Sequence, residues 1–295
     1  MHDSRLVFLK LGGSLITDKT KSMTPHLEVI RRLADEIASA GHQNPNLRLL
    51  IGHGSGSFGH AVANQYQTQS GGTDPTYWQG FAEVWSAARA LNQMVINALT
   101  QTGVAVMAFP PSAGVITHHH SIKSWDIGPI QRALSHGLTP IVQGDVTFDE
   151  KLGGTILSTE AVFQYLARLL KPQEILIAGL EEGVYWDYPI HPDLDYPDPD
   201  KQKQVDIIPC ITPINFNKIR PGLASSQAVD VTGGMLAKVE LMINLIKENP
   251  NLKVHIFSGV QPKNLQKALN GESLGTLIAN SDNAVQGTQS PGGSL

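Results

Sequence analysis

The chain has 295 residues, enough to bury a large core in one domain or two. Charged residues make up 16% and hydrophobic residues 41%, which is the balance of a globular rather than a disordered protein. The net charge of −4, without a basic cluster, argues against nucleic-acid and anionic-membrane partners. The single cysteine, Cys210, excludes an internal disulfide. With no long apolar run and no signal peptide, we expect a cytoplasmic protein.

Short apolar strands alternate with helices along the chain. We expect strands at 5–11, 47–51, 104–108, 138–143, 174–178, 253–257 and 275–278. Helices are expected from a Thr24-Pro25 cap to a stop at Gly41, at 77–101, 124–136, 161–170 and 262–269, and in a segment that ends at Lys247. This order predicts an α/β fold with a mainly parallel sheet covered on both faces, and ligands at the carboxyl ends of its strands.

Other segments lack this alternation, and we expect them at the surface. They are a polar loop at 65–76, the triplet His118-His119-His120, an irregular excursion at 188–213 and a frayed tail at 281–295. Three consecutive histidines do not readily face one metal ion, so the triplet is interpreted as a loop rather than a metal site. No linker divides the chain, which is therefore expected to be one domain over 1–295.

A glycine-rich segment, Ile51-Gly-His-Gly-Ser-Gly-Ser-Phe-Gly-His60, follows the second strand. Glycines let the backbone turn and present free N–H groups to an anion. His60 at its end could bind or protonate a phosphate oxygen near neutral pH. The segment also matches a dinucleotide fingerprint, and a tight turn with solvated histidines is the alternative interpretation.

Two further glycine loops carry lysines: Lys10-Leu-Gly-Gly-Ser14 and Thr232-Gly-Gly-Met-Leu-Ala-Lys238. A lysine at the end of a buried strand is costly unless an anion meets it. Lys19 and Lys21 follow in a polar loop. Three such loops together indicate a polyphosphate. The chain has no Gly-Lys pair and neither a His-Arg-Asp nor an Asp-Phe-Gly motif, which excludes P-loop and protein-kinase machinery.

These motifs resemble the amino acid kinase superfamily and, within it, the isopentenyl phosphate kinase family. The resemblance covers about 5–280 and rests on Lys10-Leu-Gly-Gly-Ser14 with Thr17-Asp-Lys19, His53-Gly-Ser-Gly-Ser-Phe-Gly-His60, Gly144-Asp-Val146, Asp230-Val-Thr-Gly-Gly-Met235 with Lys238, and Gly271-Glu with Gly275-Thr276. The chain departs from the family pattern at Ser55 (for Gly or Ala), at Leu157-Ser-Thr-Glu160 (for Ile-Ser-Gly-Asp) and at Leu180-Glu-Glu-Gly-Val-Tyr185 (for Asp-x-Asp-Gly-Val-Tyr).

The resemblance implies an amino acid kinase fold, a three-layer αβα sandwich. An acceptor half at about 1–170 and an ATP half at about 171–280 would carry ATP-dependent phosphorylation of isopentenyl phosphate to isopentenyl diphosphate. Mg²⁺ would be bound by the ATP phosphates, without protein ligands. The protein would be a homodimer.

The resemblance also implies roles for individual residues. The catalytic residues would be Lys10, Lys19, His60 and Glu160. The acceptor would be bound by Gly54, Ser55, Gly59, His60, Ser158 and Thr159. ATP would be bound by Lys10, Gly12, Gly13, Ser14, Ser55, Gly233, Gly234 and Lys238. Because the 77–101 helix follows the phosphate loop, its large residues Trp78, Phe81 and Trp85 are expected to line the hydrocarbon pocket.

Three alternatives remain open from the sequence. A sibling kinase with another phosphate, phosphonate or carboxylate acceptor would share the same loops. A regulatory module would keep the fold and bind nucleotide without turnover, although Lys10, Lys19, His60 and Lys238 all argue against it. An NAD-dependent oxidoreductase is disfavoured because the glycine fingerprint lacks an acidic residue after the next strand.

Overall fold

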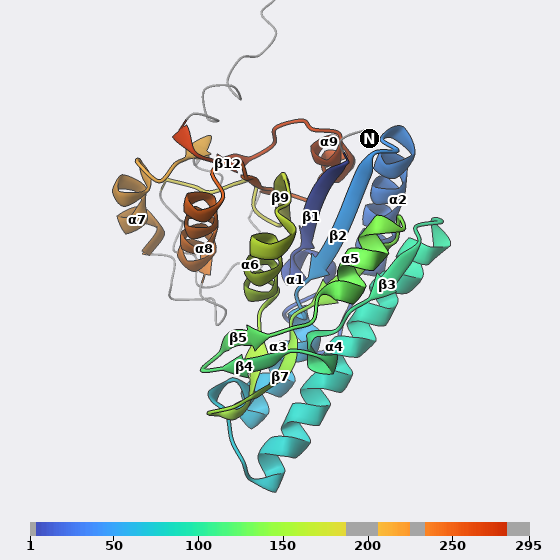
Figure 1. Cartoon of the computed structure of the whole chain (residues 1–295), viewed down its shortest axis with the longest axis vertical. Coiled ribbons are helices and arrows are strands. Elements are labelled where there is room, and N and C mark those ends of the chain that lie inside the picture. Colours follow the sequence, from blue (N-terminus) through green and yellow to red (C-terminus); the bar gives the residue numbers. More distant parts are fainter. Residues whose placement is uncertain (1–3, 187–205, 225–233, 282–295) are drawn as a thin grey trace, which may run out of the picture.

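The structure is a computed structural model that describes residues 4–186, 206–224 and 234–281. A large sheet has the strand order β10-β12-β11-β9-β1-β2-β6-β3 (Figure 1). The strands are β1 (Arg5–Leu11), β2 (Leu47–His53), β3 (Val106–Ala108), β6 (Thr139–Gln143), β9 (Glu174–Gly179), β10 (Cys210–Ile211), β11 (Lys253–Ser258) and β12 (Thr276–Ile278). Six neighbours from β11 to β3 pair in parallel, and β12 pairs antiparallel with β11. The mainly parallel sheet predicted from the alternation is confirmed.

Helices cover both faces of this sheet, which gives the predicted three layers. One face packs against α5 (Gly128–Ser135), α6 (Thr159–Leu170), α7 (Phe216–Ala224) and α8 (Gly234–Glu248). The other packs against α1 (Gly13–Ile16), α2 (Leu27–Gln43), α4 (Pro75–Gln101) and α9 (Asn264–Leu269). The central strand β1 contributes alternate side chains to the two faces, with Phe8 in one core and Leu9 in the other, because successive strand residues point in opposite directions.

A second, four-stranded sheet was not predicted. It has the order β5-β4-β7-β8 and lies beside the lower part of α4 in Figure 1. Its strands are β4 (Ile116–His118), β5 (Ser121–Ser124), β7 (Asp145–Asp149) and β8 (Gly153–Leu157). These strands are short, and their apolar residues are too few to show a clear alternation.

Several predicted boundaries are wrong. The second helix has no side-chain cap, begins at Leu27 rather than after Thr24, and runs through Gly41 to Gln43 because nothing crowds that exposed glycine. The polar 65–76 segment contains the end of α3 (Gly56–Tyr66) and a 3₁₀ turn, Thr68–Ser70. Residue 124 ends β5, so the next helix begins only at Gly128.

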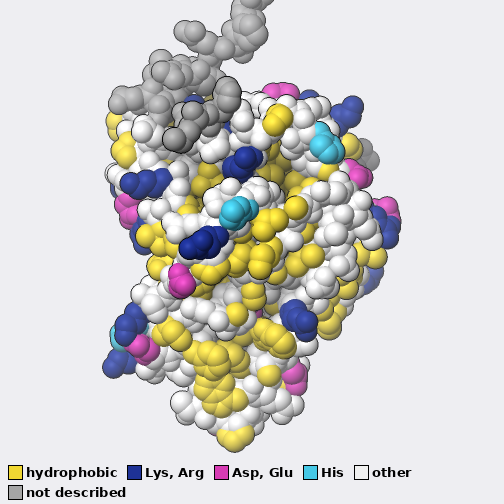
Figure 2. Space-filling view, turned by 45° about the vertical axis from the view of Figure 1, so that its right-hand side comes forward, with side chains coloured by type: hydrophobic (Ala, Val, Ile, Leu, Met, Phe, Trp, Pro, Cys, Tyr) yellow, Lys and Arg dark blue, Asp and Glu magenta, His cyan; other side chains and the backbone are white. Residues whose placement is uncertain are grey.

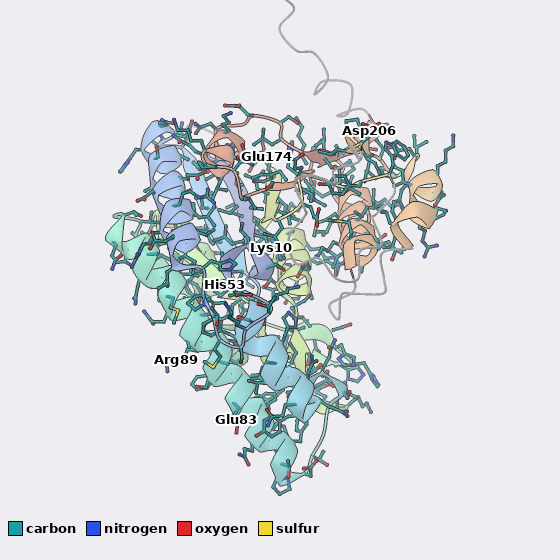
Figure 3. The ribbon with its side chains drawn as sticks, turned by 180° about the vertical axis from the view of Figure 1, so that it is seen from behind. Lys10, His53, Glu83, Arg89, Glu174 and Asp206 are labelled. Carbon is teal, nitrogen blue, oxygen red and sulfur yellow. The ribbon has the colours of Figure 1, made fainter. Side chains whose placement is uncertain are left out.

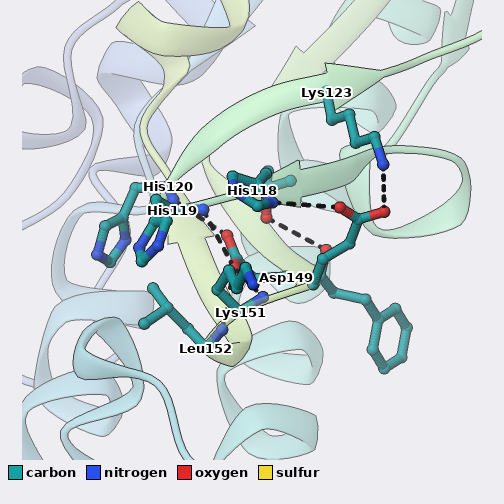
Figure 4. Close-up of polar contacts among 10 residues, drawn as sticks. His118, His119, His120, Lys123, Asp149, Lys151 and Leu152 are labelled. Carbon is teal, nitrogen blue, oxygen red and sulfur yellow. Dashed lines mark hydrogen bonds and ion pairs between the residues drawn. The ribbon is translucent and has the colours of Figure 1, made fainter.

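The His118-His119-His120 triplet forms an exposed hairpin turn between β4 and β5, which agrees with its interpretation as a surface loop. His118 ends β4, and His119 and His120 take positive φ values of 47° and 63°. The Asp149 carboxylate fixes this turn by accepting backbone N–H groups of His119, His120, Lys151 and Leu152 at 2.9–3.2 Å (Figure 4). Burial acts to raise the pKa of Asp149, but these hydrogen bonds lower it overall.

Some predictions fall outside the described residues: most of the 188–213 excursion, the tail after residue 281, and Gly233 with the preceding Asp230-Val-Thr segment. Within the described part of the chain, none of the helices combines the length and the apolar character needed to cross a membrane.

Candidate active site

Lys10 is the charged residue at the centre of the large sheet. It lies near the carboxyl end of β1, between β2 and β9, and is only 6% exposed. Its Nζ lies 2.9 Å from Oε1 of Glu160, in the first turn of α6. A buried lysine needs such a partner, and the helix N-terminus favours the carboxylate. The sheet and α6 therefore fix the first charge pair of the site.

Lys238, half-buried on α8, adds a second positive charge near the same carboxylate. Burial acts to raise the pKa of Glu160, but the charges of Lys10 and then Lys238 outweigh it, so the pKa is lowered and the group is ionised at neutral pH. The charge of Lys238 also opposes the effect of burial, which raises the pKa of Glu181. The structure thus brings together Lys10, Glu160 and Lys238, from segments far apart in the sequence.

Two glycine-rich turns meet beside this charged group. Gly13 approaches Gly56 so closely that a Cβ on Gly13 would lie 2.8 Å from the Gly56 nitrogen. Gly56 has φ +50°, a conformation that favours glycine. Within the described residues, the amides of Gly13, Ser14, Ser55 and Gly56 donate to no protein oxygen. Clustered free N–H groups at two helix starts form a cradle for phosphate oxygens.

His53 connects the glycine-rich turn to α4 through hydrogen bonds of its imidazole ring. It is fully buried at the end of β2, with Nε2 2.9 Å from Asn92 Oδ1 and Nδ1 3.1 Å from the Gly54 carbonyl oxygen. Burial lowers the pKa of His53, so the ring is neutral. Figure 3 shows Lys10 and His53 close together in the middle of the molecule. His53 is therefore part of the scaffold of the site.

His60, in contrast, lies at the edge of the turn. It occupies the first half of α3, directly after Gly59, and its side chain is half-buried rather than enclosed. Ser55 stands at the N-cap position of the same helix without capping it through its side chain. His60 and the Ser55 amide therefore belong to one short segment at a helix N-terminus, as the sequence predicted for an anion site.

Other predicted acceptor residues have partners within the fold. The Ser158 hydroxyl caps α6 by accepting the Ala161 N–H at 3.1 Å. The buried Thr159 hydroxyl donates to the His53 carbonyl oxygen at 2.6 Å. The Ser158 hydroxyl thus caps the first turn of α6, and the Thr159 hydroxyl holds α6, and with it Glu160, against the end of β2.

An aromatic cluster lies between α4 and the small sheet. Tyr77, Trp78 and Phe81 of α4 contact one another edge-to-face or at a tilt, with ring centroids 5.2–6.3 Å apart. The ring of Phe148 in β7 lies 5.9 Å from that of Trp78 and 5.3 Å from that of Phe81. Phe148 is 51% exposed. Figure 2 shows hydrophobic side chains gathered on the lower part of its face, in the half of the molecule that holds the small sheet.

Trp85 does not join this cluster, so the expectation that it shares a pocket with Trp78 and Phe81 is not supported. Its side chain is 38% exposed and lies 5.5 Å from the Arg89 guanidinium, which covers its ring. The small sheet packs on Tyr77, Phe81 and Val84. Trp85 lies on the exposed side of the next turn of α4, in which Ala87 and Ala88 are buried.

Asp145, the first residue of β7, is a buried carboxyl that has no cationic partner among the residues the structure describes. It is 1% exposed and accepts N–H groups of Val146 at 2.9 Å and Ser112 at 3.1 Å. Burial raises its pKa from 3.8 to about 6, against the lowering effect of these hydrogen bonds. Between those values the folded state keeps a proton that the unfolded state has released. The stability from this group is therefore present below about pH 4 and lost as the pH rises through about 6.

Asp145→Asn should remove this titration. We expect the unfolding free energy of the variant, relative to the unchanged protein, to rise by about 2–3 kcal/mol between pH 4 and pH 7. Urea unfolding at the two pH values measures the difference. Asp35→Asn, an exposed carboxyl on α2, is the control and should show a difference that hardly varies with pH. A flat profile for Asp145→Asn would show that this carboxyl is ionised throughout.

The C-terminal half contains a separate cavity of about 280 Å³. Its lining residues are Glu182, Ile207, Pro209, Phe257, Ser258, Asn264, Leu274 and Gly275. Neither Lys10 nor Glu160 lines it, so the charged centre lies outside this cavity. Among the described residues, no group of three or more histidine, cysteine, aspartate or glutamate side chains is arranged to hold a metal ion.

No supporting role was predicted for four residues that hold the site together, namely His53, Thr17, Ser57 and Asn92. His53, Thr17 and Ser57 stand inside the recognised motifs, but nothing in their spacing indicates their partners. Each is joined to a distant residue by a hydrogen bond, and such a bond produces no apolar pattern in the sequence.

Comparisons with known proteins identify the family of the chain. The Amino acid kinase family profile matches residues 5–258. The isopentenyl phosphate kinase of Methanocaldococcus jannaschii is 32% identical over 280 residues, covering 92% of this chain and 98% of that protein. The same enzyme of Methanothermobacter thermautotrophicus is 30% identical with equal coverage. A solved isopentenyl phosphate kinase structure superposes with a TM-score of 0.75 at 26% identity, covering 93% of this chain and all of the other.

Proposed function

The chain belongs to the amino acid kinase family, and from that premise we propose that it transfers the γ-phosphoryl group of ATP to isopentenyl phosphate, giving isopentenyl diphosphate and ADP. The observation that carries the proposal is the buried Lys10–Glu160 pair beside two adjoining turns with free amides. Two anionic substrates need such a centre of positive charge and N–H donors. The relatives of similar length named for this reaction support the choice of acceptor.

The acceptor phosphate needs no strong base, because it is already largely deprotonated at pH 7. One of its oxygens attacks the γ-phosphorus, the bond from the γ-phosphorus to the β–γ bridging oxygen breaks, and ADP leaves with the electron pair. Lys10 binds the transferring group, and Lys19 stabilises the charge that develops on the β-phosphate side. Glu160 keeps Lys10 oriented, and Lys238 binds the nucleotide. Mg²⁺ on the phosphates offsets further charge when it is bound.

The two halves of the chain would divide the substrates. The turn at Gly54, Ser55 and Gly59, with His60, would bind the acceptor phosphate, as part of an acceptor half at about 1–170. The amides of Gly13 and Ser14 would face ATP together with Gly234 at the start of α8, in a half at about 171–280 that extends to these turns. Gly12 belongs to the same turn, but its own N–H donates to the Ala178 carbonyl oxygen at 2.8 Å. Gly233 completes this set from outside the described residues. We further propose a homodimer, to be measured by light scattering, and a cytoplasmic location, which the single free thiol of Cys210 supports.

The aromatic cluster supplies a test of acceptor length. Trp78 and Phe81 would enclose a five-carbon chain, so Trp78→Leu and Phe81→Leu should raise kcat/KM for a ten-carbon phosphate, relative to the five-carbon acceptor, by about 10-fold or more. Trp85→Leu is the matched control, because Trp85 lies outside the cluster, and it should leave the ratio unchanged. The measurement is steady-state kinetics with both acceptors. An unchanged ratio in both cluster variants would place the hydrocarbon pocket elsewhere.

The function itself is tested by ADP release from ATP with isopentenyl phosphate, followed by a panel of other small phosphates, phosphonates and carboxylates. We expect the highest kcat/KM with isopentenyl phosphate. A higher value with a different acceptor would identify a sibling kinase. ATP binding without ADP release on any acceptor would identify a regulatory module.

A further inference from the structure

The loop that carries Lys19 is closed at its base. Residues Thr17 and Pro25 form an antiparallel bridge, the Asp18 N–H donates to the Thr24 carbonyl at 2.9 Å, and the His26 N–H donates to the Ile16 carbonyl at 2.9 Å. Lys19 itself is exposed near the tip. Contacts that hold the base of this loop therefore also set the position of the Lys19 backbone, from which the long, exposed side chain extends.

Ser57 of α3 fixes that base through all three of its polar groups. Its N–H donates to Thr17 Oγ1 at 2.9 Å, its carbonyl accepts the Met23 N–H at 3.2 Å, and its hydroxyl accepts the Thr24 N–H at 3.2 Å. Ser57 belongs to the glycine-rich segment between Gly56 and Gly59. The segment assigned to the acceptor phosphate is thus bonded directly to the loop that carries Lys19.

Thr17 extends the connection to the other glycine turn. Its hydroxyl accepts the Ser57 N–H and donates to the Gly13 carbonyl at 2.8 Å. Thr17 is 1% exposed and Ser57 is 5% exposed, so water does not compete for these bonds. One buried hydroxyl therefore joins the Gly12–Ser14 turn, the Lys19 loop and the acceptor turn.

We propose that Thr17 and Ser57 are positioning residues that hold Lys19 in register with the acceptor phosphate, an inference that rests on the proposed kinase function. In-line transfer requires reacting atoms about 3–3.5 Å apart, and a displacement of about 1 Å lowers the rate by about 10²-fold. The alternative role is structural only: the hydroxyls would stabilise the fold without acting through Lys19.

The test variant is Thr17→Val, which keeps the shape of the side chain and removes its hydroxyl. We expect kcat to fall by about 10- to 100-fold, with KM for ATP within about 3-fold. Thr17→Ser restores the hydroxyl and should stay within about 3-fold of the unchanged protein. Ser57→Ala, which removes one of the three contacts, should lower kcat less than Thr17→Val. Thr102→Val, at the far end of α4, is the matched control for hydroxyl loss and should leave kcat unchanged.

A double-mutant cycle with Lys19→Met separates the two roles. Lys19→Met alone should lower kcat/KM by about 10²-fold. If Thr17 acts through Lys19, adding Thr17→Val to Lys19→Met should lower kcat by less than about 3-fold more. The proposal would be overturned if the fold-losses of kcat in the two single variants multiplied in the double variant. Full activity of Thr17→Val would also overturn it. Circular dichroism and thermal melting of each variant confirm that it is folded at the assay temperature.

Failure of this inference is distinct from failure of the proposed function. ADP release by the unchanged chain is measured first, and the absence of acceptor-dependent release overturns the kinase function and the inference together. Acceptor-dependent release combined with multiplying effects in the cycle leaves the kinase function standing and removes only the role of Thr17.

Discussion

Lys10→Met is expected to lower kcat/KM by about 10²-fold or more, while the far-ultraviolet circular dichroism spectrum hardly changes. The ammonium group is preorganised at the centre of the sheet, 2.9 Å from Glu160, where charge develops during phosphoryl transfer. Methionine keeps an unbranched side chain, one atom shorter than lysine, and removes the ammonium group with its charge and its N–H donors. The measurement is ADP release at varied concentrations of both substrates, so that kcat and each KM are obtained separately.

Arg89→Met is the matched control for this loss of charge. Arg89 is an exposed cation on α4 that covers Trp85, and its removal changes the net charge equally without touching the site. We expect nearly full activity from it. Near-normal activity in Lys10→Met as well would mean that the transferred phosphoryl group binds elsewhere.

Glu160 should not set the pH dependence of this reaction near neutrality. The charges of Lys10 and Lys238 lower its pKa despite burial, so the carboxylate is lost only on acidification below its ordinary range. The second ionisation of a phosphate monoester lies near pH 6. Protonation of the acceptor phosphate should therefore lower kcat/KM near pH 6, and the same profile measured on Asp145→Asn separates it from the titration of Asp145, whose pKa is raised to about 6. The stabilising Lys10–Glu160 pair breaks only at lower pH.

The features that could be predicted from the sequence are those indicated by neighbouring residues. The strand that ends at Lys10 and the turn from Gly54 to Gly59 each lie within a dozen residues, where apolar runs and glycines are direct signals. The parallel sheet follows from the alternation of strands and helices. These features were predicted correctly because no distant residue is needed to specify them.

The remaining features depend on distant partners. The small sheet pairs β4 with β7, about 30 residues away, through strands too short to show a pattern. Thr17 meets Ser57 across 40 positions through one hydroxyl. Trp85 directly follows the buried Val84, so its exposure depends on which side of α4 the neighbouring elements cover. Tertiary contacts of this kind decide the site but leave no local periodicity.

His60→Ala should lower kcat/KM for the acceptor by about 10- to 150-fold, the effect of losing a charge-assisted hydrogen bond of about 1.5–3 kcal/mol. His60 follows Gly59 in α3, half-buried at the edge of the turn assigned to the acceptor phosphate. ATP affinity should hardly change, because the nucleotide is assigned to the Gly12–Ser14 turn and to Lys238. Steady-state kinetics for the acceptor and calorimetric titration of ATP measure the two effects separately.

Two variants refine this test of His60. His60→Gln keeps a neutral N–H donor and should lose less activity than His60→Ala, which separates hydrogen bonding from simple packing. His42→Ala, an exposed histidine near the end of α2, controls for the loss of an imidazole elsewhere and should retain full activity. Equal losses of ATP and acceptor affinity in His60→Ala would assign this histidine to both substrates. Unchanged kinetics would make it a surface residue, and the acceptor phosphate would then be bound by the amides of Ser55 and Gly56 without an imidazole.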